Sequence, residues 1–140
     1  MTCIKVLDNC ILHHREEQRD ARGRLLSLEV GRDIPFEIAR VYFLYGSASG
    51  DERGFHAHRR LEQWAICVAG ACTIVLDDGR ARAEVRLDSP EKSLHIGAMI
   101  WRELKDFSPE AVLMVFASAP YDAADYVHDY QSFVALAGGG

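Results

Sequence analysis

Two histidines separated by a single residue carry the strongest chemical signal in this sequence. His56 and His58 lie in the segment Gly50-Asp-Glu-Arg-Gly-Phe-His-Ala-His-Arg-Arg-Leu-Glu-Gln. In an extended chain, residues two apart share a face, so the two imidazoles point in the same direction. Imidazole titrates near neutral pH and serves either as a general base or as a metal ligand. The segment therefore predicts proton-transfer chemistry or a metal site.

Short β-strands must position these histidines, because alternation of apolar and polar residues dominates the chain. Residues 80–87 alternate without a fault and follow Asp77-Asp78-Gly79, a hairpin turn signal. Further strands are expected at residues 24–30, 38–45, 63–69, 71–76, 94–96, 99–104 and 112–118. A turn or two of helix is expected within residues 123–136. Many short strands separated by turns predict an all-β sandwich or barrel with a short helical segment near the C-terminus.

Composition narrows the classes of protein to consider. The 140 residues predict a single domain spanning 1–140. The formal net charge of −5 argues against a nucleic acid polymer as partner. The longest apolar run, residues 64–69, is too short to cross a membrane, and no signal peptide is recognised. None of the four cysteines forms a C-x-x-C pair. We therefore expect a cytoplasmic protein with reduced thiols.

The spacing around the histidines resembles the first motif of the cupin superfamily. Gly50, His56, His58 and Glu62 follow the pattern Gly-x5-His-x-His-x3-Glu, in which the histidines and the glutamate of cupins bind a metal. The second cupin motif normally ends on a further histidine ligand, and Arg102 stands at that position. Arginine has no lone pair to donate and repels a divalent cation. This substitution favours a metal-free site for acid–base chemistry; a metal site completed by another residue is the alternative.

The wider sequence resembles the sugar 3,4-ketoisomerases, a family of RmlC-like cupins. The resemblance runs from about residue 7 to residue 133 and includes two specific motifs, Arg-Gly-Phe-His-Ala-His at 53–58 and Pro-Tyr-Asp-Ala-Ala-Asp-Tyr at 120–126. It implies a cupin jelly-roll barrel that works without metal or organic cofactor. It also implies a homodimer with exchanged N-terminal strands. The implied reaction moves the keto group of dTDP-4-keto-6-deoxyglucose from C4 to C3 and feeds the synthesis of deoxy amino sugars.

This reaction needs a base for a carbon-bound proton, an acid–base group for the oxygens and a stabiliser for the enediol intermediate. The resemblance implies that His56 carries the proton between C3 and C4 and that Tyr42 lies beside the sugar. His58 shares a face with His56 and is expected to orient His56 or the sugar. Arg102 is expected to hold the developing enediolate charge. Family members carry arginine or histidine at this position, so it is expected to influence the stereochemistry of the product.

The diphosphate of such a substrate requires cations, and arginine binds phosphate oxygens with two parallel hydrogen bonds. The candidates are Arg22, Arg40 and Arg53. Tyr126 is expected to pack in the core or at a dimer interface. Two other functions remain open: a 3,5-epimerase acting on the same sugar nucleotide, and a cupin that binds a nucleotide sugar without catalysis.

Overall fold

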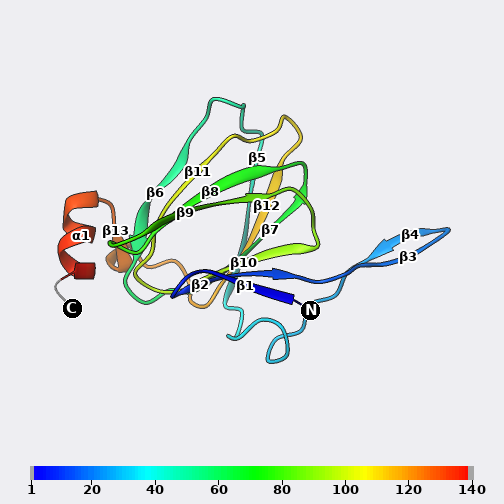
Figure 1. Ribbon diagram of the computed structural model, residues 1–140, viewed down its shortest axis with the longest axis horizontal. Helices are drawn as coiled ribbons and strands as arrows, with labels where there is room; N and C mark the ends of the chain where they lie inside the picture. Colours follow the sequence, from blue (N-terminus) through cyan, green and yellow to red (C-terminus); the bar gives the residue numbers. More distant parts are fainter. Residues whose placement is uncertain (1, 139–140) are drawn as a thin grey trace.

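The computed structural model describes residues 2–138, which form two facing antiparallel β-sheets (Figure 1). The first sheet has the strand order β1 (Thr2–Leu7), β2 (Cys10–His14), β10 (Lys92–Ile96), β7 (Gln63–Ala69), β12 (Val112–Ala117) and β5 (Arg40–Tyr45). The second has the order β13 (Tyr126–Val127), β6 (Arg53–His58), β11 (Trp101–Lys105), β8 (Cys72–Asp77) and β9 (Arg82–Leu87). Neighbouring strands are mostly distant in the sequence, as in a jelly roll. The predicted all-β cupin fold is confirmed.

The two sheets enclose the main hydrophobic core, and alternation along the strands decides which side chains reach it. On β12, Leu113 and Val115 are buried inside, whereas Met114 and Phe116 lie on the outer face of the sheet and are half-buried. Residues two apart along a strand lie on the same face, so one strand serves two surfaces. The inner surface forms the barrel interior in which the candidate site lies.

The C-terminal segment packs beside β6 on the outside of the second sheet (Figure 1). A short 3₁₀ turn, η1 (Ala123–Asp125), leads into β13, and the helix α1 (Tyr130–Gly138) follows. Phe133 is fully buried and packs in one cluster with Trp101 and Val127. The helical segment expected near the C-terminus is therefore confirmed, and burial of Phe133 fixes it to the second sheet.

The strand expected at residues 24–30 is wrong for most of its length. The chain forms a protruding two-stranded hairpin of β3 (Gln18–Asp20) and β4 (Gly23–Leu25), and the strand ends there (Figure 1). The next residues turn, with the backbone N–H of Asp33 donating to the carbonyl oxygen of Glu29 at 2.8 Å. Leu28 packs against the apolar cluster on the outer face of the first sheet. The apolar pattern thus reflects packing on a sheet rather than pairing within it.

No helix within residues 2–138 is long and apolar enough to span a membrane.

Candidate active site

Strand β6 contains a β-bulge immediately before the first histidine. His56 lies opposite Arg102 on β11, but the next partner of β11, Glu103, lies opposite Gly54, which leaves Phe55 without a partner. Gly54 and Phe55 both have left-handed backbone angles, with φ of 89° and 57°. Such a φ costs a non-glycine residue roughly 1–3 kcal/mol and is found mainly at functional sites. The bulge therefore marks this part of β6 as a place where side-chain direction matters.

The bulge brings two side chains to the same cavity that a regular strand would separate. Arg53 and His56 are three residues apart, so regular alternation would place them on opposite faces. With Phe55 as the extra residue, both Arg53 and His56 line the cavity. Gly54 is required here, because a Cβ at this position would lie 2.9 Å from the Arg102 carbonyl oxygen and 2.9 Å from Leu104 Cδ1.

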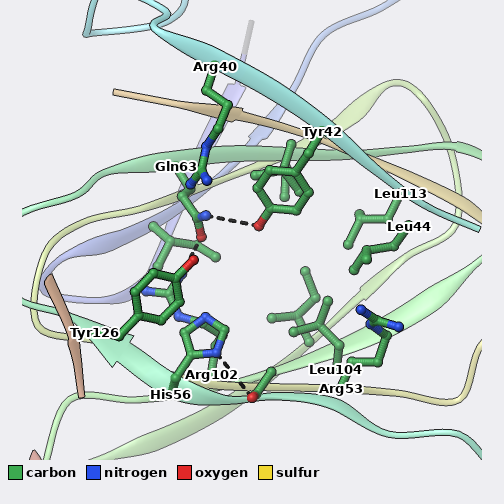
Figure 2. A pocket seen from close by; sticks show the side chains of 15 residues that line it. Arg40, Tyr42, Leu44, Arg53, His56, Gln63, Arg102, Leu104, Leu113 and Tyr126 are labelled. Atoms are coloured by element: carbon green, nitrogen blue, oxygen red, sulfur yellow. Dashed lines mark hydrogen bonds between the residues drawn. The ribbon is translucent and has the colours of Figure 1, made fainter. Parts of the chain in front are cut away.

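A cavity of about 260 Å³ lies inside the barrel between the two sheets. One part of its wall is polar and is formed by Arg40, Tyr42, His56, Gln63, Arg102 and Tyr126 (Figure 2). The other part is mainly aliphatic, with Leu44, Leu104 and Leu113 beside Arg53 (Figure 2). An apolar cavity with a few convergent polar groups is typical of a small-molecule site. The cavity brings together Tyr42, His56 and Arg102, three of the predicted catalytic residues.

His56 is held in one tautomer. Its Nδ1 lies 3.1 Å from the carbonyl oxygen of Gly54, and because a carbonyl only accepts, Nδ1 carries the proton. Nε2 is therefore left with its lone pair. Burial lowers the pKa of His56 from 6.5 to about 4, and the positive charge of Arg102 contributes in the same direction. His56 is thus a neutral imidazole at physiological pH, as a base must be.

His58 is buried more deeply and faces a second cavity. Its ring centroid is 5.0 Å from that of His56, and its side chain is 1% exposed. Burial, reinforced by Arg102 and His56, lowers the pKa of His58 to about 2. Nδ1 of His58 lies 3.5 Å from Asp125 Oδ2, too far for a strong hydrogen bond. His58 therefore stays neutral and packs beside His56, which fits an orienting role better than proton transfer.

Tyr42, Gln63 and Arg102 form a continuous hydrogen-bonded chain across the cavity wall. Arg102 Nη1 donates to Gln63 Oε1, and Gln63 Nε2 donates to the Tyr42 hydroxyl oxygen at 3.0 Å (Figure 2). Burial raises the pKa of Tyr42, while the charge of Arg102 and the hydrogen bond from Gln63 oppose that rise. Gln63 was not identified as a site residue from the sequence. The only sequence signal for it is a polar residue opening an otherwise apolar strand.

Tyr126 lines the cavity, whereas the sequence predicted that it packs in the core or at a dimer interface. Strand β13 places it opposite His58 on β6. Its ring centroid lies 5.0 Å from that of His56 and 4.4 Å from that of His58. Its hydroxyl points toward the polar wall near Gln63 (Figure 2). The sequence did contain a signal for this placement, because Tyr126 is the last residue of the specific motif Pro-Tyr-x-x-x-Asp-Tyr. A tyrosine in such a motif can serve the site as well as packing.

The three arginines predicted to bind phosphate lie in different places. The Arg40 guanidinium stacks on the rings of Tyr42, at 5.4 Å, and Tyr121, at 5.8 Å, and forms no ion pair within residues 2–138. Arg53 stands at the aliphatic end of the cavity (Figure 2). Arg22 is on the protruding hairpin, where its 90% exposed side chain pairs with a neighbouring aspartate. The structure therefore places Arg40 and Arg53 at the cavity and Arg22 away from it.

Glu62, which matches the glutamate of the cupin metal motif, does not line the cavity with His56. Its Oε1 lies 2.9 Å from Nε2 of His95, and Gln63 faces the cavity instead. Among residues 2–138, no group of three His, Cys, Asp or Glu side chains is placed to hold a metal ion. The guanidinium of Arg102 lies on the cavity wall beside His56.

Comparison with known proteins identifies relatives that share both sequence and fold. Residues 8–138 match the family model FdtA, described as WxcM-like, C-terminal. The chain is 45% identical over 114 residues to TDP-4-oxo-6-deoxy-alpha-D-glucose-3,4-oxoisomerase from Aneurinibacillus thermoaerophilus, covering 81% of this chain and 82% of the relative.

Two crystal structures of 3,4-ketoisomerases superimpose on nearly the whole chain. The enzyme from Helicobacter canadensis is 39% identical, with a TM-score of 0.89 over 93% of this chain and 98% of that one. A histidine-to-asparagine mutant of QdtA from Thermoanaerobacterium thermosaccharolyticum, in complex with TDP-4-keto-6-deoxyglucose, is 34% identical, with a TM-score of 0.91 over 95% of this chain and 96% of that one.

Proposed function

The chain belongs to the FdtA, WxcM-like family, and we propose that it is a 3,4-ketoisomerase that converts TDP-4-keto-6-deoxyglucose into the 3-keto isomer. The similarity to a 3,4-oxoisomerase and to two ketoisomerase structures supports the reaction and the substrate. The observation in the molecule that carries the proposal is the pair of groups on facing sheets: a neutral imidazole, His56 on β6, and a phenol, Tyr42 on β5, at one cavity. A 3-keto sugar is what an aminotransferase needs to install nitrogen at C3, so the product would feed deoxy amino sugar synthesis.

His56 moves the carbon-bound proton in this mechanism. The C4 carbonyl acidifies the C–H bond at C3, and Nε2 of His56 removes that proton to give an enediolate across C3 and C4. The same imidazolium then returns a proton to C4. Because the lowered pKa of His56 makes its imidazolium a strong acid, the return of the proton is favoured. One base on one face of the sugar suffices for both steps.

Tyr42 and Arg102 handle the oxygens. The O3 hydroxyl must lose its proton as C3 becomes a carbonyl, and O4 must gain one as C4 becomes a carbinol. A phenol that donates to O4 and then receives the O3 proton returns to its starting state. Arg102 places a fixed positive charge at the wall of the cavity, where it favours the enediolate over the neutral substrate. His58 supports His56 by packing edge-on against it.

We assign the diphosphate to the arginines at the cavity. The Arg40 guanidinium lies over the rings of Tyr42 and Tyr121 and forms no ion pair within residues 2–138, which leaves its donors available to phosphate oxygens. Arg53 lies at the other end of the cavity, so it would hold the diphosphate in place of Arg40 if the nucleotide occupied that end (Figure 2). Arg22 would contribute only if the hairpin of another subunit reached this cavity, which is the case to test in the dimer.

We propose that the protein functions as a homodimer. In the single chain β2 pairs with β10 of its own sheet, so the exchange of N-terminal strands implied by the family resemblance requires β1 and β2 to take the same place on the partner's sheet. The outer face of the first sheet supports an assembly, because Phe43 and Tyr45 of β5 are 51% and 74% exposed there. An apolar crevice of about 290 Å³ lies on the outer side of the same sheet, between Leu28, Met114 and their neighbours. Exposed apolar surface of this kind is typical of a protein interface.

Turnover in deuterium oxide, followed by NMR, tests the proposed function. A 3,4-ketoisomerase gives a sugar with its carbonyl at C3 and deuterium at C4, because the base exchanges its proton with solvent between the two steps. Incomplete exchange, with some of the C3 hydrogen recovered at C4, also fits a single histidine. Deuterium at C5 with the carbonyl still at C4 would identify an epimerase. Binding without exchange at any carbon would identify a protein that only binds the nucleotide sugar.

A further inference from the structure

Gln63 stands between the two groups to which the proposed mechanism assigns the oxygen chemistry. Its side chain opens β7 and is almost fully buried, with a residue exposure of 4%. On one side, the guanidinium of Arg102 donates to its Oε1. On the other side, its Nε2 lies 3.0 Å from the Tyr42 hydroxyl oxygen. No other side chain within residues 2–138 makes a hydrogen bond that joins these two groups.

The orientation of this amide follows from the chemistry of arginine. A guanidinium has donors only, so the Gln63 oxygen must face Arg102 and the amide nitrogen must face Tyr42. Arg102 is itself fixed, because its Nε and Nη2 donate to the carbonyl oxygen of Ile100 at 3.2 Å and 2.9 Å. The residue is 2% exposed, so the charge of its guanidinium is weakly screened. The position of Arg102 therefore determines that the amide nitrogen of Gln63, and not its oxygen, contacts the Tyr42 hydroxyl.

We propose that Gln63 is a positioning residue that transmits the charge of Arg102 to Tyr42 and reserves the phenolic proton for the sugar. Since the Tyr42 oxygen accepts a hydrogen bond from Gln63, its single proton is left to donate into the cavity. When that proton leaves, the hydrogen bond that Gln63 Nε2 donates to the Tyr42 oxygen strengthens, because the acceptor is then a phenolate. The inference rests on the proposed function, because it assigns how Tyr42 is prepared for the oxygen proton transfer.

The isosteric change Gln63→Glu reverses the polarity of this chain. A carboxylate keeps the contact with Arg102 but has no N–H to offer Tyr42, so the phenol donates its only proton to the carboxylate. The substrate then loses its donor, while the cavity keeps its shape. Gln63→Leu removes the hydrogen bond without reversing it. We therefore expect Gln63→Glu to lower kcat more than Gln63→Leu does.

A double-mutant cycle with Tyr42→Phe separates this role from simple support of the fold. In the wild-type background we expect kcat to fall roughly 10-fold in Gln63→Leu, the worth of one lost hydrogen bond to a charge-bearing group, and about 100-fold in Gln63→Glu. The KM should change little in either variant. In the Tyr42→Phe background, Gln63→Leu should change kcat less than about twofold, because residues that act as a unit are not additive. Gln63→Glu should lose less there than in the wild-type background, and the part that remains is the effect of its carboxylate on the charge of Arg102.

Thr73→Val is the matched control. Thr73 is also buried and also partners an arginine, accepting from Arg86 Nη1 at 3.0 Å, but it does not line the cavity. Its effect on kcat should be small and the same in both backgrounds. Additive losses for the Gln63 variants and Tyr42→Phe would overturn the proposal. So would a Gln63→Glu variant that is as active as the wild type.

A titration that needs no turnover gives an independent readout. With 3-fluorotyrosine incorporated at every tyrosine, the ¹⁹F signal lost in Tyr42→Phe identifies Tyr42, and its titration reports the pKa of that phenol. We expect this pKa to rise in Gln63→Leu and to rise further in Gln63→Glu, while Thr73→Val leaves it unchanged. An unmoved pKa would overturn the proposal. If the wild type fails to turn over TDP-4-keto-6-deoxyglucose, the proposed function fails, and the ¹⁹F titration still decides whether Gln63 acts on Tyr42.

Discussion

Burial and the charge of Arg102 together should set the acid limb of the pH profile through the pKa of His56. Burial lowers the pKa of His56 from 6.5 to about 4, and Arg102 is the second cause of that shift. A base works in its neutral form, so kcat/KM of the wild type should stay level down to about pH 5 and fall below about pH 4. A free histidine with the ordinary pKa would lose activity about two units higher.

Replacing the charge tests this reasoning. Because burial is the larger cause, Arg102→Met should return less than half of the shift and raise the pKa of His56 by about one unit. At pH 4 the neutral fraction of His56 would then fall from about one half to about one tenth, a loss of about fivefold beyond any effect seen at pH 7. Arg102→Lys keeps the positive charge and should leave the acid limb near its original place.

The assay is kcat/KM against pH, with product formation measured by NMR and folding checked by circular dichroism at each pH. The position of the acid limb does not depend on the maximal rate, so a general loss of kcat in Arg102→Met does not obscure the shift. An acid limb near pH 6.5 in the wild type would refute the argument from burial. A limb that does not move in Arg102→Met would refute the role of the charge.

Three further outcomes follow from the geometry. His56→Asn should still bind the nucleotide sugar, measured by calorimetry, but lose roughly 10²–10⁴-fold in kcat, whereas His58→Asn should lose less; the opposite order would exchange their roles. Tyr42→Phe should lower kcat more than it changes KM. A change confined to KM would show that Tyr42 only binds the substrate. Phe133→Ala should cost about 3–5 kcal/mol of unfolding free energy, measured by denaturant titration, because it empties the contact that fixes α1; a loss below about 1 kcal/mol would show that α1 is held by other contacts.

Much of the barrel could be predicted because a strand with one solvent-exposed face has alternating apolar and polar residues in its sequence. The strand expected at residues 63–69 has the observed bounds of β7, and β5 differs from its expected range only at its start. The hairpin at Asp77-Asp78-Gly79, which joins β8 to β9, could also be predicted, because it depends on the local turn residues. The strand expected at 24–30 was wrong because apolar residues that pack on the outside of a sheet have the same pattern as residues within one.

The chemical site was only partly visible for a related reason. The His-x-His spacing fixes the common direction of its two side chains locally, so His56 and His58 could be placed together. The bulge at Phe55 depends on the register between β6 and β11, which local sequence does not encode beyond the permissive Gly54. It is this register shift that lets Arg53 share the cavity with His56.

The chain of hydrogen bonds through Gln63 was beyond sequence reasoning altogether, because its members come from three strands in two sheets. Tyr42 lies on β5, Gln63 on β7 and Arg102 on β11, and only the closed barrel brings them into contact. The substitution at position 102 was nevertheless informative. It led to the prediction that a cation stands where a metal-binding cupin has a ligand, and the structure places the Arg102 guanidinium on the cavity wall.

In the proposed mechanism, one buried arginine acts on both acid–base groups, the imidazole of His56 and the phenol of Tyr42. Its charge adds to the effect of burial in lowering the pKa of His56, which keeps that base unprotonated, and it opposes the rise that burial causes in the pKa of Tyr42. A surface charge would do neither, because solvent would screen it. The cost of burying the guanidinium is offset by its bonds to Ile100 and Gln63. The carbonyl oxygen and the amide that hold Arg102 are therefore as necessary to the proposed mechanism as the charge itself.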